Sequence, residues 1–189
     1  MVGLSDGIVN KRVPKNRFKA ELVGVDVITW LYKISADTAD FRHGDTIVEI
    51  QVFRVVFKGD QIIKRELAAI QKEIPYPILF IAHGKSYFMV EGELLESDKQ
   101  FIDGDALTIE RRSAKLTELY DDIASAFVAI APKVDENIAE LAVRYKQLRA
   151  IERALDVLQR KVDAEKQPNK RIELNEELKR LKAEKEQLL

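Results

Sequence analysis

Carboxylates beside a predicted strand come nearest to a catalytic pattern in this sequence. A metal-dependent nuclease needs two or three carboxylates, usually with a lysine, that converge on a divalent ion. The best match is Glu49, with Gln51 two residues further on and Asp40 or Asp45 as the second acid. The lysine is absent, and alternating carboxylates are ordinary on the exposed face of a strand. A metal-dependent nuclease subunit is therefore the alternative hypothesis.

Other catalytic patterns are incomplete. Gly84 and Lys85 lack the glycine that a phosphate-binding loop needs five residues before Gly84, because Leu79 stands there. The two histidines, His43 and His83, lie far apart in predicted loops. The sequence has no cysteine, so disulfides and thiolate metal sites are excluded. We assign no catalytic residue, metal or cofactor, and this favours a protein that is not an enzyme.

A cluster of cations with no acid occurs early in the chain: Lys11, Arg12, Lys15, Arg17 and Lys19. Pro14 and Gly24 suit the start and the end of a helix, which predicts a short helix over residues 15–23. Cations at a helix start are electrostatically unfavourable. The cluster is therefore a contact for DNA phosphates or for an acidic partner, or else a solvated face. Any contact with DNA would be weak and independent of base sequence, and Arg111 and Arg112 would join it.

The overall composition sets limits on partners and location. The 189 residues include 31 basic and 32 acidic side chains, so the net charge of −1 does not attract nucleic acid or a membrane. The longest apolar run, over residues 75–82, is far shorter than a membrane span. The N-terminus has no signal-peptide core. We expect a cytoplasmic protein that makes no contact with a membrane.

The C-terminal stretch over residues 133–189 predicts an antiparallel helical hairpin. Its apolar residues alternate at spacings of three and four, which is typical of a coiled-coil seam. Pro168 and Asn169 interrupt the helix and favour a turn, so that the shorter second arm folds back on the first. The seam residues are Ile138, Leu141, Tyr145, Leu148, Ile151, Leu155, Leu158, Val162, Leu174, Leu178, Leu181 and Leu188.

The preceding residues predict a small α+β domain over residues 11–131, after a disordered leader over residues 1–10. Apolar and polar residues alternate over residues 27–35 and 46–58, which predicts two strands. Within the second strand the apolar residues change from one face to the other, which indicates a bulge or burial on both faces. A helix from Asp60 to residue 74, an apolar strand over residues 78–81 and a returning strand over residues 87–91 follow. Residues 93–105 are predicted to be irregular, with one more strand over residues 106–110 and a helix starting at Ser113. This order predicts a mixed or antiparallel sheet with flanking helices.

Five segments in this order resemble a bacterial and archaeal family defined as a numbered domain of unknown function. They are RVPKNRF (12–18), WLYKIS (30–35), VEIQVF (48–53), IPYPILF (74–80) and EKQPNKRIELN (165–175). The resemblance covers nearly the whole chain from Arg12. One departure is Pro168, where the family pattern leads us to expect an aromatic residue.

The resemblance implies a role in DNA modification or phage defence, because members of the family are often encoded beside DNA methyltransferase and helicase genes of restriction-like loci. It implies a non-catalytic accessory or scaffolding subunit, and it carries over no catalytic residue. We expect the hairpin to bind a helicase or methyltransferase subunit, or a second copy of the chain.

Overall fold

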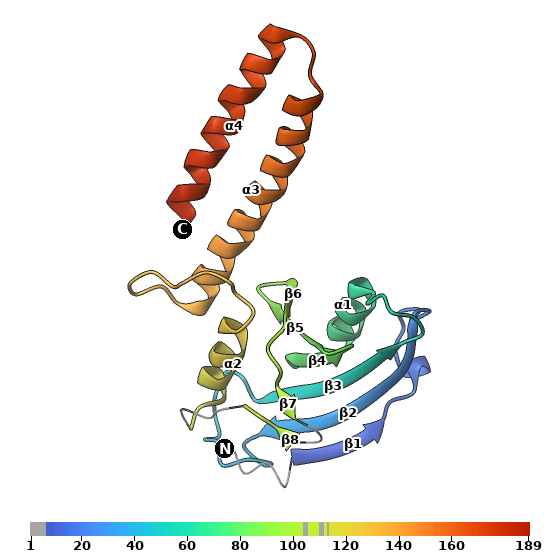
Figure 1. Ribbon diagram of the computed structural model, residues 1–189. Coiled ribbons are helices and arrows are strands. Elements are labelled where there is room, and N and C mark those ends of the chain that lie inside the picture. Colours follow the sequence, from blue (N-terminus) through green and yellow to red (C-terminus); the bar gives the residue numbers. More distant parts are fainter. Residues whose placement is uncertain (1–6, 104–105, 110–111, 113) are drawn as a thin grey trace. The chain divides into compact units, whose positions relative to one another are not determined.

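The computed structural model describes residues 7–103, 106–109, 112 and 114–189. The chain divides into two compact units, residues 1–127 and 128–189. The first unit contains a six-stranded mixed sheet with helices, and the second contains a pair of antiparallel helices (Figure 1). The predicted α+β fold with a C-terminal helical hairpin is confirmed. Within the described residues, no helix combines the length and the apolar character needed to span a membrane.

The six strands of the sheet lie side by side in the order in which they occur in the chain. All neighbouring pairs are antiparallel except β3 and β4, which are parallel and are connected through helix α1 (Lys64–Glu73). The strands are β1 (Ile8–Arg12), β2 (Val25–Ser35), β3 (Glu49–Phe57), β4 (Ile78–Ala82), β5 (Lys85–Val90) and β6 (Glu93–Ser97). Two further strands, β7 (Ile102–Asp103) and β8 (Ala106–Leu107), pair with each other.

Helices cover both faces of this sheet. On one face, Leu67 and Ile70 of α1 pack in a core with Phe53 of β3 and Phe80 of β4. On the other face, helix α2 (Leu116–Ser125) approaches β5, where the ring of Tyr120 lies 5.3 Å from that of Phe88. Burial on both faces explains why β3 is buried at every position from Glu49 to Phe53 and lacks a simple alternating pattern.

The irregular pairing between β2 and β3 originates in β2. Its register with β3 shifts between Val25 and Val27 and again between Trp30 and Tyr32, so β2 has one extra residue in each interval. Each extra residue is a β-bulge, which bends the strand and increases its twist. The change of phase in β3 therefore reflects burial on both faces rather than a bulge within β3 itself.

Two predictions for the N-terminal region are wrong. Residues 8–10, assigned to the leader, belong to β1, while residues 1–6 lie outside the described part of the chain. The predicted helix over residues 15–23 is reduced to one 3-10 turn, η2 (Lys15–Arg17). Distant side chains bind backbone N–H groups of the following residues, as described below, and this binding replaces the hydrogen bonds of a helix.

The last strand of the six-stranded sheet was also missed. His83 (φ 48°) and Gly84 (φ 74°) form a tight turn between β4 and β5, which agrees with the loop predicted at His83. Residues 93–97, expected to be irregular, form β6 at the sheet edge. Every residue of β6 is half-buried, so the strand has no alternation of apolar and polar positions that the sequence could reveal.

Helices α3 (Ile138–Ala164) and α4 (Pro168–Leu188) form the hairpin. Asn137 caps α3 by accepting hydrogen bonds from the backbone N–H groups of Ala139 and Glu140, and the Glu140 side chain accepts from the N–H of Asn137. Pro168 is the first residue of α4 rather than part of the turn, a position at which its missing N–H costs nothing.

Candidate functional site

The basic cluster of the sequence lies on the edge strand β1, on η2 and on the connection that follows. Lys11, Arg12, Arg17 and Lys19 are exposed. Within the described part of the chain, these four side chains form no ion pair and no hydrogen bond. Lys15 differs, because it is half-buried and its Nζ donates a 2.8 Å hydrogen bond to the backbone oxygen of Val25. Four of the five predicted cations are therefore available to an anionic partner.

Two glutamates of α1 hold the connection that carries the cluster. The Glu73 carboxylate accepts hydrogen bonds of 2.8 Å from the backbone N–H groups of both Lys19 and Ala20. These bonds stabilise the ionised carboxylate and lower the pKa of Glu73 below its ordinary value. Seven residues earlier, the buried Glu66 accepts bonds of 3.0 Å from two further backbone N–H groups, those of Gly24 and Val25.

Gly24 allows this connection to lie close against α1. A Cβ atom at position 24 would overlap Cδ1 of Ile63 and would lie 3.3 Å from a carboxylate oxygen of Glu66. Gly24 was predicted to end a helix, but no helix reaches it, and here it permits this close approach. Glycine and the two glutamates together fix the position of the basic residues relative to the sheet.

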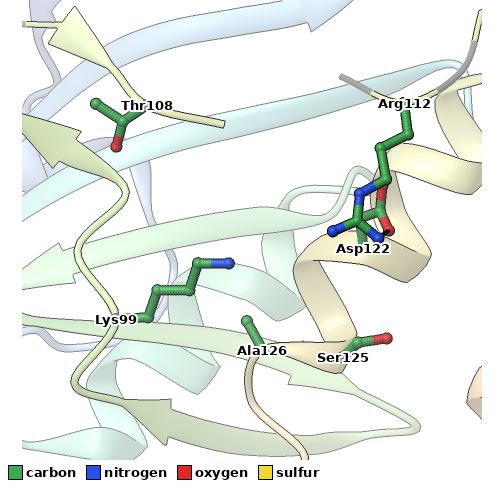
Figure 2. Close-up of a pocket in the computed structure, with 6 residues that line it drawn as sticks. All are labelled: Lys99, Thr108, Arg112, Asp122, Ser125 and Ala126. Carbon is green, nitrogen blue, oxygen red and sulfur yellow. Dashed lines mark ion pairs between the residues drawn. The ribbon is translucent and has the colours of Figure 1, made fainter. Parts of the chain in front are cut away.

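The cavity drawn in Figure 2 is polar and measures about 480 Å³. Its walls come from α2 and from the segments that follow β6 and β8, and Arg112 and Asp122 lie side by side in its wall as an ion pair of 3.6 Å. The Nζ of Lys99 lies 5.3 Å from the centre of the Phe101 ring. Two cations and one carboxylate give this cavity a positive balance that suits a small anion. Arg111, which the sequence analysis grouped with Arg112, lies outside the described residues.

The acids of the nuclease hypothesis have separate partners. Glu49 is buried, lies 3.3 Å from the Nζ of Lys33 and accepts a 2.5 Å hydrogen bond from Gln51. Asp45 accepts hydrogen bonds from the backbone N–H and the hydroxyl of Thr117, which lower its pKa to about 2. Asp45 thereby accepts from a backbone N–H in the first turn of α2 that has no partner within the helix. Ser113, the residue predicted to cap this helix, lies outside the described residues. Among the described residues, no group of three or more histidine, aspartate or glutamate side chains is arranged to hold a metal ion.

In the hairpin, six of the residues predicted for the seam pack against one another. Leu158, Val162 and Leu178 are buried together, with Leu155, Leu174 and Leu181 packed against them. Every α4 residue outside the series Leu174, Leu178, Leu181, Lys185 and Leu188 is exposed. Lys185, which interrupts the apolar series, reaches Glu152 of α3 at 2.9 Å.

A buried arginine closes the open end of the hairpin. The guanidinium of Arg144 donates two hydrogen bonds of 2.7 Å to Glu136 and one to the backbone oxygen of Ala131. It also donates to the backbone oxygen of Leu188, the last residue of α4. Arg144 therefore joins both helices and the segment before α3. The sequence did not indicate this role, because an arginine beside the seam of a helix is usually exposed.

The described architecture is a mixed α+β domain followed by a helical hairpin. Residues 6–184 match the family model described as a domain of unknown function (DUF4391), and the chain belongs to this family. Comparison with curated proteins and with solved structures finds no match.

Proposed function

We propose that this protein is a non-catalytic accessory or scaffolding subunit of a cytoplasmic DNA-modification or phage-defence complex. Its hairpin would bind a larger helicase or methyltransferase subunit, and its basic cluster would make a weak, sequence-independent contact with DNA. The family resemblance motivates the kind of complex. The support from the fold is a hairpin whose apolar seam is internally filled but whose surface retains a second apolar series.

That second series lies on the outer side of α3 and is the observation that carries the proposal. Val143 and Val157 are 47% and 52% exposed, and the exposed Ala150 lies between them at steps of seven residues. Residues seven apart share one helix face, so these three side chains form a narrow apolar line along α3 against which a further helix can pack. An apolar series of this kind on the mostly polar exposed side of α3 suits a helical segment of a partner protein.

Co-purification from the native host tests the docking. A tagged full-length chain is expected to retain a methyltransferase or helicase subunit, and the double variant Val143→Glu/Val157→Glu is expected to lose it. Glutamate is a good helix former, so α3 should persist. The matched control is Ile172→Glu, which removes an aliphatic side chain that is 59% exposed on α4.

Two results would reject the docking proposal. One is retention of the partner by the double variant at the level of the unaltered chain. The other is recovery of a homodimer alone, by light scattering, that the double variant dissociates, since this would assign the α3 series to self-association. The nuclease alternative receives no support from the described carboxylates, because Glu49 and Asp45 are each engaged elsewhere.

A further inference from the structure

A second cavity, of about 280 Å³, adjoins the basic cluster, and four of the nine residues that line it are aromatic. Phe18, Trp30, Phe53 and Tyr76 line it, together with Arg17 of the cluster and Glu73 of α1. Its volume lies near the lower end of the range for small-molecule sites, roughly 300–1,000 Å³, so it suits a single ring system rather than an extended ligand. Phe18, Trp30 and Tyr76 are half-buried, which leaves part of each ring accessible from the cavity.

Packing and hydrogen bonds hold these rings in place. The indole Nε1 of Trp30 donates a 2.9 Å hydrogen bond to the backbone oxygen of Tyr32. The Trp30 ring lies 6.2 Å from the ring of Phe53, which in turn meets Phe80 of the core edge-on at 6.3 Å. A fixed aromatic wall binds a planar ligand without a large loss of side-chain entropy.

The segment with Tyr76 is held in the same way. The side-chain nitrogen of Gln71 donates to the backbone oxygen of Tyr76 at 2.8 Å, while its side-chain oxygen accepts from the N–H of Ile78 at 3.0 Å. Gln71 therefore fixes both sides of the short link between α1 and β4.

The polar groups of the cavity carry opposite charges. Each oxygen of Glu73 already accepts one backbone hydrogen bond, and an ionised carboxylate has about four acceptor positions in all. Glu73 therefore retains acceptor capacity for N–H groups of a ligand. Arg17 is exposed and, within the described residues, has no acidic partner, so its guanidinium is available for a phosphate.

We propose that this cavity receives one unstacked base of single-stranded DNA, whose phosphates lie along Lys11, Arg12, Arg17 and Lys19. Every base has a π-face that stacks on aromatic side chains, and every base edge offers an N–H group to a carboxylate such as Glu73. An aromatic cavity of this kind also suits a quaternary ammonium group, but Arg17 would repel such a cation. The inference rests on the proposed DNA contact and does not depend on docking by the hairpin.

The test compares binding of the full-length chain to a short labelled single strand, the same strand with abasic sites, and the corresponding duplex. The ordinary strand is expected to bind more tightly than the abasic strand. Trp30→Ala and Tyr76→Ala are each expected to weaken binding of the ordinary strand by roughly 5- to 150-fold, the range for loss of one stacking aromatic, and to leave the abasic strand unaffected. Tyr76→Phe should retain binding, as should the matched control Tyr145→Ala in α3. Circular dichroism verifies that each variant is folded, and Tyr76→Ala decides the outcome if Trp30→Ala does not fold.

Several results would overturn the inference. They are equal affinity for the ordinary and abasic strands, unaltered single-strand binding by folded Tyr76→Ala, and displacement of the strand by a trimethyl-lysine peptide. If duplex binding persists in any of these cases, the proposed DNA contact stands and the base site alone fails. Absence of binding to both single strands and duplex would reject both, while the hairpin proposal is judged separately by co-purification.

Discussion

Arg144 and Glu136 form an ion pair, and Arg144 makes the Glu136 carboxyl group harder to protonate. The hydrogen bonds from Arg144 lower the pKa of Glu136 from 4.5 to about 2. The unfolded chain therefore takes up this proton at a higher pH than the folded chain does. The stabilisation by Glu136 is complete above about pH 4.5 and is lost as the pH falls toward 2.

This linkage gives a pH prediction for the hairpin. Lowering the pH from about 5 to 2 is expected to reduce the free energy of unfolding, and Glu136→Gln is expected to remove that part of the dependence. Asp45 and Glu96 also have pKa values of about 2, so the difference between the unaltered chain and the variant isolates Glu136. Urea denaturation at a series of pH values measures it, and parallel pH profiles for both proteins would contradict the prediction.

The sequence indicated which residues are charged but not which groups they bind. The five cations are apparent from the sequence, yet nothing local distinguishes Lys15, which binds a backbone oxygen, from its exposed neighbours. Glu66 and Glu73 look like ordinary charges of a helix face, although each binds two backbone N–H groups more than 40 residues away. The aromatic cavity was not predictable either, because Phe18, Trp30 and Tyr76 come together only through the sheet and α1.

The packing of the helical hairpin leads to a prediction about its stability. Leu178 is the buried residue of α4, so Leu178→Ala is expected to destabilise the hairpin by about 2–4 kcal/mol. Ile172→Ala is the control, since this side chain is 59% exposed and should change stability by less than about 0.5 kcal/mol. Amide hydrogen exchange in α4 measures both, and equal protection in the two variants would mean that the Leu178 contact adds little.

Prediction of elements succeeded where the pattern was local. The three–four spacing of α3 and α4 needs no distant partner to be recognised, and the apolar strand over residues 78–81 is recognisable as a sheet centre. Prediction failed where tertiary contacts override the local pattern. Residues 15–23 do not form the predicted helix, because Glu66 and Glu73 of α1 bind backbone N–H groups in and next to this segment. Strand β6 was missed because every residue of this edge strand is half-buried, so its sequence has no periodic pattern.

Because the net charge of the chain is −1, any attraction to DNA must come from the local cluster. With about four phosphates neutralised by the exposed cations, the logarithm of the duplex binding constant should fall with log salt at a slope near −3.6. Arg12→Ala/Arg17→Ala/Lys19→Ala should flatten that slope by about 2.7. Lys15 is left intact because of its bond to Val25.

The control for this salt series removes the same charge elsewhere. Lys179→Ala/Arg180→Ala/Lys182→Ala replaces three exposed cations of α4 and should leave the slope unchanged. Fluorescence anisotropy between low and physiological salt gives the slopes. If both triple variants change the slope equally, the contact is a general electrostatic effect and the cluster has no special role.

The strand order of the sheet has a consequence for synthesis on the ribosome. Because neighbours in the sheet are neighbours in the chain, each strand finds its partner already made when it emerges. The α1 side of the sheet is covered early, since α1 precedes β4. The opposite side, with Phe88 and Leu79, stays open to solvent until residues 116–125 have been added, which takes seconds at about 5–20 residues per second. During that interval the nascent chain presents an apolar sheet face, and this face is where a chaperone would bind.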